Sequence, residues 1–305
     1  MAYSSETTLK RPVTIKGTGL HTGACVGVSL VPAPPRSGIT FALGSERFTL
    51  REATVRSTEL CVGIAKGKKE VKTVEHLLSA IFGIGLTNVT VRVQGPEIPI
   101  LDGSALPFFE VLERAGLVRQ PARKQVAVVL KPVVVTLGDR WVSLWPRVED
   151  DPRTLRIEVE VDFAHSTIGR QSLELDVTPG TYRQALAPAR TFGFLEDVEA
   201  MRSKGLIKGA SLANAVVLDA DAGVLNPEGL RFPDEFVRHK ALDIVGDLSL
   251  VGYPLVGRYV AFKPGHALNV MMIERLRTIQ GAFVIQDLDQ LRASADSPLL
   301  AAAIS

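Results

Sequence analysis

The chain has 305 residues, of which 46% are hydrophobic and 22% charged, and its 35 basic and 33 acidic residues give a net charge of +2. At ~100–200 residues per domain, this length predicts two domains, and the hydrophobic content excludes a disordered chain. The near balance of charge argues against a protein that binds along a phosphate backbone, so we expect no nucleic-acid partner.

The cysteines and the N-terminal residues indicate the compartment. Cys25 and Cys61 lie far apart, and neither has a second Cys or a His beside it at metal-ligand spacing, which excludes a disulfide framework. Residues 1–17 hold no apolar core of a signal peptide, and the longest apolar run, 77–86, has about half the length of a membrane span. We therefore expect a cytoplasmic protein with no integral membrane segment.

Strand-like segments dominate the first part of the chain. Short alternating runs rich in β-branched residues predict strands near 13–21, 25–32, 38–43, 47–52 and 88–93. Runs rich in Leu, Ala or Phe predict helices over 74–82 and 107–115, stopped by Gly83 and Gly116. The basic residues of 66–69 are expected to form a charged hairpin loop between strands.

The second half repeats the order of strands followed by helices. Its strand-like runs lie at 125–137, 140–146, 155–163 and 172–177, and its helical runs lie near 196–204 and 236–251. The polar, Pro-containing stretch 119–123 separates the halves, so we expect domains of residues 1–122 and 123–305. Runs of strands followed by helices favour two α+β domains over a doubly wound parallel sheet, with a site at their junction.

The predicted helix at 236–251 carries a line of polar residues. His239 and Asp243 are four residues apart, so their side chains share one face of the helix, and Asp247 extends that face by another turn. A surface ion pair is the ordinary explanation of such a spacing. However, the helix is largely apolar and has few charges after Lys240, which favours a functional role.

A second candidate group is Glu75 and His76, at the start of an apolar helical run. Zinc hydrolases place such a carboxylate beside their metal ligands to activate water, although acidic residues are common in any first helical turn. Together, His76, His239 and Asp243 form a two-His, one-carboxylate set that leaves one coordination position open, with Glu75 as a base. His266 follows a Pro-Gly turn, a loop position from which its ring could reach a cleft.

Other catalytic and nucleotide-binding motifs are poorly supported. The glycines of 17–23 have the wrong spacing for a dinucleotide loop, and the chain has no Walker A sequence. The segment 209–213 lacks the second glycine of a nucleophile elbow, which argues against a serine hydrolase.

Six motifs carry a resemblance to a known family. They read KGTGLHTG, KTVEHLLSAIFG, PEIPILDGSALPF, ARTFGF, LRFPDEFVRHKALDIVGDL and KPGHALN. In this order they resemble the UDP-3-O-acyl-N-acetylglucosamine deacetylases, zinc amidases of lipid A synthesis, and the match runs from about Arg11 to Leu276. The tail after Ala293 has no clear counterpart.

The resemblance implies an architecture. We expect an α+β fold of two similar domains, each with a mostly antiparallel sheet and a helix pair, and with the helices packed together as an inner layer. The resemblance also implies one small insertion in each domain. The later insertion, expected within 155–171, would form a hydrophobic passage for the acyl chain.

The resemblance also implies a role for each site residue. The expected Zn²⁺ ligands are His76, His239 and Asp243, the three residues that the spacing selects. The expected catalytic groups are Glu75 as general base, His266 as general acid, Asp247 to orient and charge His266, and Thr191 to stabilise the oxyanion. The expected substrate-binding residues are Lys240, Phe192 and, with a less defined role, His21.

The expected reaction is removal of the N-acetyl group from UDP-3-O-(3-hydroxyacyl)-N-acetylglucosamine, giving acetate and the free amine, the committed step of lipid A biosynthesis. A zinc amidase for a different acylated amino sugar and a non-catalytic binding protein of the same fold remain as alternatives. A two-His, one-carboxylate set can also hold ferrous iron. The sequence gives neither the preferred acyl-chain length nor a signal for oligomerisation, and we expect a monomer.

Overall fold

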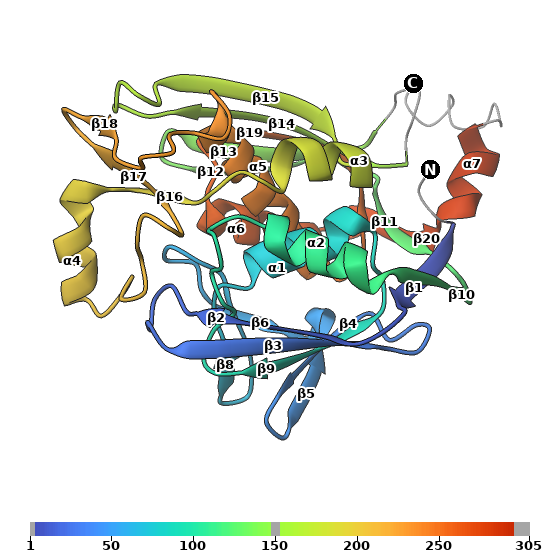
Figure 1. The fold of residues 1–305 in the computed structure, drawn as a ribbon. Helices are drawn as coiled ribbons and strands as arrows, with labels where there is room; N and C mark the ends of the chain where they lie inside the picture. The colour runs from blue at the N-terminus through green and yellow to red at the C-terminus, as the bar shows by residue number, and fades with distance from the viewer. Residues whose placement is uncertain (1–3, 148–152, 296–305) are drawn as a thin grey trace.

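The computed structural model describes residues 4–147 and 153–295, and in it two sheets enclose a layer of helices (Figure 1). The five-stranded sheet has the order β2 (Val13–Thr18), β3 (Cys25–Pro32), β9 (Val89–Gln94), β4 (Ile39–Leu43), β5 (Glu46–Thr49). The seven-stranded sheet has the path β12 (Val133–Leu137), β13 (Arg140–Trp145), β19 (Leu255–Phe262), β11 (Gln125–Val129), β20 (Phe283–Asp287). From β19 it also extends to β14 (Leu155–Asp162) and β15 (Arg170–Asp176).

The predicted α+β class is confirmed. Most strand pairs are antiparallel, and the parallel pairs of the two large sheets are β4 with β9, β11 with β19, and β14 with β19. The inner layer contains α1 (Glu75–Ile84), α2 (Leu106–Ala115), α5 (Glu235–Leu248) and α6 (His266–Thr278). One apolar core runs through this layer and the inner faces of both sheets.

Two small sheets lie outside this frame. One contains β6 (Thr54–Ser57), β7 (Gly63–Lys66) and β8 (Lys69–Val71). The other contains β16 (Phe192–Phe194), β17 (Val216–Asp219) and β18 (Gly223–Val224), with α4 (Val198–Ser203) between its first two strands, and it extends to the left in Figure 1. The expected insertion within 155–171 is therefore wrong. Those residues form β14, a turn and the start of β15 in the large sheet, whereas 192–224 form the extension.

The remaining elements complete the chain. They are β1 (Ser5–Leu9), which pairs with β10 (Leu117–Arg123), the short helices at Leu50–Glu52, Pro179–Thr181 (α3), Tyr182–Leu186, Leu195–Asp197 and Ser249–Val251, and α7 (Leu288–Ala295). The polar stretch 119–123 is thus part of a strand. We propose that the domain boundary lies at residue 122, near the end of this strand. Residues 296–305 of the C-terminal tail lie outside the described residues.

The predicted helix ends are correct in one case and wrong in the other. Gly116 follows α2 with a positive φ of 76°, as expected of a stop signal. The stop of α1 is Gly85, with φ 83°, and Gly83 lies inside the helix, where an added Cβ would lie 2.3 Å from the Tyr182 ring.

The 66–69 hairpin is confirmed by the pairing of β7 with β8. None of the helices in the described part of the chain combines the length and apolarity that a membrane span requires.

The helices α1 and α5 touch at a glycine. A Cβ at Gly246 would lie 2.2 Å from the main-chain oxygen of Glu75, so only glycine allows this approach. One turn further along α1, the Ser79 hydroxyl donates a hydrogen bond of 2.8 Å to the carbonyl of Leu242. This contact brings the start of α1 beside the middle of α5.

Candidate metal centre and active site

Three buried side chains converge where α1 meets α5. His76 comes from α1, and His239 and Asp243 come from successive turns of α5. Asp243 Oδ1 lies 3.4 Å from His239 Nε2 and 3.8 Å from His76 Nε2, and the three potential ligand atoms lie within 4.8 Å of one another. Among the described residues, Asp243 Oδ1 has no hydrogen-bond partner. An unsatisfied buried carboxylate oxygen between two imidazoles fits a bound divalent cation.

Neighbouring residues and burial hold the three side chains in orientations and protonation states that suit metal ligands. Nδ1 of His239 lies 3.1 Å from the carbonyl of Ala189, a contact that leaves Nε2 free to ligate. The Lys240 ammonium donates to Asp243 Oδ2 at 3.0 Å. Burial alone would raise the pKa of Asp243, but the nearby cationic groups outweigh it, so the pKa is lowered and the carboxylate stays ionised. Burial and the neighbouring His239 lower the pKa of His76 to about 3, so its imidazole is neutral.

Glu75 occupies the first position of α1, beside His76, His239 and Asp243, the candidate metal-binding group. Its Oε2 accepts a hydrogen bond of 2.9 Å from the main-chain N–H of Val62, which fixes the carboxylate at the cavity wall. Burial raises the pKa of Glu75 to about 7. A carboxylate with a raised pKa is suited to accept a proton near neutral pH.

His266 faces the same cavity from the first position of α6, so its prediction as a loop residue is wrong. Its Nδ1 lies 2.8 Å from Asp247 Oδ2, and the Asn269 amide donates to the same oxygen at 2.8 Å. Burial alone would lower the pKa of His266, but the charge and hydrogen bond of Asp247, with smaller contributions from Asp243 and Glu75, raise it to about 9. His266 is therefore protonated at neutral pH.

Asn269 and Tyr259 hold Asp247 in place, and no short motif in the sequence points to either residue. Asn269 lies one turn after His266 on α6, and its side-chain oxygen accepts a hydrogen bond of 2.7 Å from the Tyr259 hydroxyl of β19. The helical spacing of His266 and Asn269 would have pointed to this pair only if α6 had been predicted.

A cavity of about 270 Å³ unites most of the predicted site residues. Those that line it are Glu75, His76, Thr191, Phe192, His239, Lys240, Asp243 and His266, and the lining also includes Arg140 of β13, which the sequence did not indicate. Asp247 lies behind His266. The Lys240 ammonium also lies 5.5 Å from the centre of the Phe192 ring.

A buried ion pair holds the segment that contains Thr191 and leads into β16 at Phe192. The guanidinium of Arg190 donates to both carboxylate oxygens of Glu235, at 2.8 and 3.1 Å, and Glu235 is the first residue of α5. The main-chain N–H of Thr191 donates to the carbonyl of Gly103 at 2.8 Å. The ion pair ties the start of β16 to α5, the helix of His239, and the Thr191 hydrogen bond ties it to Gly103. The sequence reasoning missed both contacts.

His21 is buried but does not line this cavity. Its main-chain N–H donates to Glu97 Oε2 at 3.2 Å, and neither ring nitrogen has a hydrogen-bond partner among the described residues. Burial lowers the pKa of His21, so the ring is neutral. Its neighbour Leu20 contributes to the cavity wall.

Comparison with known proteins identifies the family. The family model for UDP-3-O-acyl N-acetylglycosamine deacetylase matches residues 6–278. This chain belongs to that deacetylase family. A UDP-3-O-acyl-N-acetylglucosamine deacetylase of Myxococcus xanthus is 42% identical over 286 residues, which cover 92% of this chain and 89% of the relative. The deacetylase of Oleidesulfovibrio alaskensis is 44% identical over 269 residues, covering 87% and 86% of the two chains, and that of Brucella melitensis biotype 2 is 40% identical over 282 residues, covering 91% and 97%.

Proposed function

We propose that this chain is a Zn²⁺-dependent amide hydrolase that removes the N-acetyl group from UDP-3-O-(3-hydroxyacyl)-N-acetylglucosamine. The products are acetate and the free amine, and the reaction belongs to lipid A synthesis. The observation that carries the proposal is the convergence of His76, His239 and Asp243 beside a buried carboxylate and a protonated imidazole. The names of the relatives supply the substrate, and a cytoplasmic monomer remains our prediction.

The chemistry of the ligand set suits zinc. Two neutral imidazoles and one ionised carboxylate are ligands that catalytic zinc sites use. A zinc ion held by His76, His239 and Asp243 would supply Lewis-acid chemistry at the cavity wall. Glu75 acts beside these ligands as the general base, and its carboxylate takes the proton of the attacking water.

Two further residues, His266 and Thr191, donate a proton and a hydrogen bond to the substrate. His266, charged by Asp247, donates its proton to the amine as the bond to the acetyl carbon breaks. The Thr191 hydroxyl donates a hydrogen bond to the oxyanion that forms on the acetyl group. His266 also adds a positive charge beside that oxyanion until its proton is transferred.

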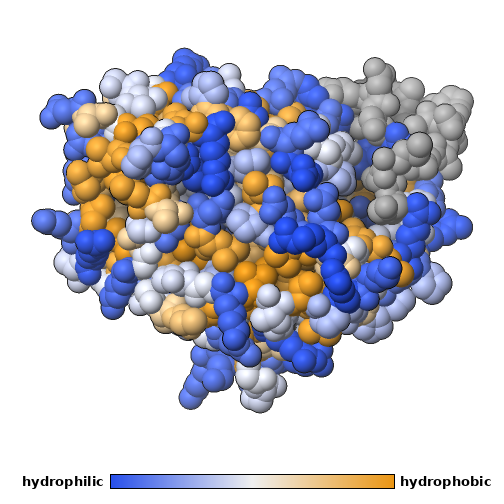
Figure 2. All heavy atoms as spheres, viewed as in Figure 1, coloured by the Kyte–Doolittle hydropathy of each residue, from blue (hydrophilic) through white to orange (hydrophobic). Residues whose placement is uncertain are grey.

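The substrate contacts follow from the remaining cavity residues. Lys240 places a cation at the cavity wall, which suits the polar sugar and diphosphate groups. Phe192 begins an apolar cluster that includes Phe236, at a ring distance of 5.0 Å, and Phe163, at 5.6 Å. Apolar side chains also gather over the β16–β18 sheet in the space-filling view (Figure 2). We assign the passage for the acyl chain to this segment.

The test measures acetate release from the UDP-linked substrate by metal-free protein before and after addition of zinc. We expect turnover only with zinc, and Glu75→Gln should lower kcat by about 10²–10⁴-fold while binding zinc normally. Glu46→Gln, at an exposed strand position, is the matched control and should be fully active.

The outcomes separate the alternatives. Tight substrate binding without acetate release would favour a non-catalytic binding protein. Release of acetate only from an acylated amino sugar that lacks the uridine diphosphate would favour a different amidase. Turnover restored by ferrous iron but not by zinc would reject zinc as the cofactor.

A further inference from the structure

A second and larger cavity, of about 790 Å³, lies at the other end of the helix layer. It shares no lining residue with the cavity at the metal-binding group. Along helix α1, the nearest lining residues of the two cavities are His76 and Phe82, which are six residues or about 9 Å apart. The second cavity lies towards β10 and β11, on the right in Figure 1, whereas the small β16–β18 sheet lies on the left.

The walls of this cavity are largely apolar. They include Phe82 and Ile84 of α1, Phe109 of α2, Val245 and Leu248 of α5, and Leu255 of β19. These side chains belong to the apolar core or pack against it. A cavity of this size is in the range that holds a small-molecule ligand.

Among the described residues, one charged side chain of the lining, that of Lys124, has no counter-charge. Lys124 forms no side-chain hydrogen bond or ion pair with any described residue, although its main chain is held by hydrogen bonds to Ser4 and Leu288. Burial lowers the pKa of Lys124 to about 8, and no carboxylate contributes to that pKa. The acidic residue of the lining, Glu113, pairs with Arg183 at 3.4 Å. A partly buried ammonium without an anion is unfavourable and is stabilised when an anionic group binds beside it.

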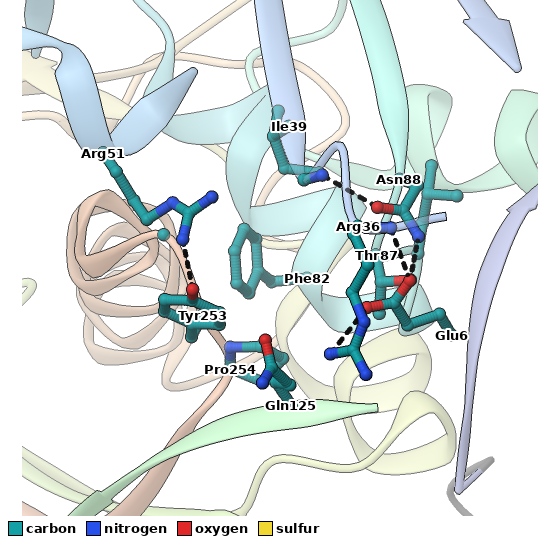
Figure 3. A pocket seen from close by; sticks show the side chains of 13 residues that line it. Glu6, Arg36, Ile39, Arg51, Phe82, Thr87, Asn88, Gln125, Tyr253 and Pro254 are labelled. Carbon is teal, nitrogen blue, oxygen red and sulfur yellow. Dashed lines mark hydrogen bonds and ion pairs between the residues drawn. The ribbon is translucent and has the colours of Figure 1, made fainter. Parts of the chain in front are cut away.

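A neighbouring smaller cavity, of about 240 Å³, shows the contrast (Figure 3). There each cation has a polar partner: Arg36 lies 3.6 Å from the Glu6 carboxylate, and Arg51 donates a hydrogen bond to the Tyr253 hydroxyl. Both cavities are lined by Phe82, Tyr253 and Pro254. Among the described residues, Lys124 is the lining cation whose side chain has no hydrogen-bond or ion-pair partner.

We propose that the larger cavity binds a free fatty acid, with its carboxylate on the Lys124 ammonium and its alkyl chain along the apolar walls. A fatty acid satisfies both features of the cavity, because its chain removes apolar surface from water while its head group forms a charge-assisted hydrogen bond. A neutral lipid would leave the ammonium unpaired. This site is separate from the acyl passage at Phe192, and it does not depend on the proposed deacetylase activity.

The test follows the reactivity of Lys124 itself. Near pH 8 a large fraction of this amine is unprotonated, so an amine-acetylating reagent should label it, and peptide mass spectrometry measures the rate. We expect dodecanoate, below its micelle concentration, to slow this labelling about tenfold, and dodecanol to have little effect. Labelling of exposed Lys131 is the internal control, since it should be the same with either additive.

A second measurement uses binding. Lys124→Gln should weaken dodecanoate binding at this site by about tenfold, the loss of one hydrogen bond to a charged group, and Lys124→Arg should retain it. Lys131→Gln is the matched control, and basal acetate release should be unchanged in all three variants. Labelling of Lys124 that dodecanoate does not slow, or that dodecanol slows equally, would overturn the proposal.

Discussion

At the scale of residues, the protonation of His266 predicts how kcat depends on pH. Its pKa of about 9 lies above the ordinary value, so the ring is protonated at neutral pH and loses its proton as the pH rises through about 9. If His266 is the general acid, kcat should fall on this alkaline side.

Replacement of Asp247 by Asn tests this assignment. Asp247→Asn keeps a similar shape but removes the charge, so burial should lower the pKa of His266 and move the alkaline limit of kcat down by about one pH unit or more. A pH profile of acetate release measures the limit, and an NMR titration of the ring in metal-free protein measures the pKa. Asp221→Asn, in an exposed turn, is the control. A uniform loss of rate with an unmoved limit would assign Asp247 a structural role only.

The sequence indicated the residues that could bind the metal better than it indicated the residues that surround them and hold them in place. The i,i+4 spacing selected His239 and Asp243, because helical periodicity alone puts such residues on one face. Arg190, Asn269 and Arg140 were missed, since each meets the site through a contact between elements distant in the chain. Local patterns do not contain such contacts.

The approach of helices α1 and α5 at Gly246 makes a prediction at the scale of elements. Gly246→Ala should push α5 away from Glu75, because the new methyl group would lie 2.2 Å from a main-chain oxygen. We expect a loss of about 1–3 kcal/mol in the free energy of unfolding, together with weaker zinc binding and lower kcat. Urea unfolding and zinc titration measure these effects.

A matched glycine provides the control for that variant. Gly180 has its nearest potential Cβ contact at 3.9 Å, so Gly180→Ala should change neither stability nor activity appreciably. Normal zinc affinity in Gly246→Ala would contradict the role of this contact in bringing the ligands together.

The sequence predicted elements with strong periodicity and missed weakly patterned ones. The five-stranded sheet and strands β11 to β15 of the seven-stranded sheet were expected, since alternation of apolar and polar residues is visible in the chain. Strands β19 and β20 of the seven-stranded sheet were not predicted. The helix beginning at His266 was missed because it follows a Pro-Gly pair, and the segment 155–171 was misassigned because alternation does not say which sheet a strand joins.

For the whole molecule, we expect bound metal to stabilise the fold. A ligand present at about a thousand times its Kd contributes about 4 kcal/mol, so chelation should lower the Tm by on the order of 5–10 °C. Differential scanning calorimetry with and without zinc measures the shift. The variant His239→Ala should show no shift, and a metal-dependent shift in that variant would place the ion elsewhere.

The α+β class could be anticipated from the order of strands and helices, whereas the packing of the helices as an inner layer was expected only from the family resemblance. Where α1 and α5 meet, that packing depends on the missing side chain of Gly246 and on the hydrogen bond from Ser79 to the Leu242 carbonyl. The division at residue 122 remains our proposal for the boundary.

The ligands come from segments that a ribosome makes far apart in time. His76 belongs to α1, whereas His239 and Asp243 belong to α5, more than half the chain later. A nascent chain that has reached only α1 carries one ligand and an apolar helix without its partner. The candidate metal-binding group therefore exists only after most of the protein has been synthesised, and a chain cut short before α5 has neither His239 and Asp243 nor the helix that packs against α1.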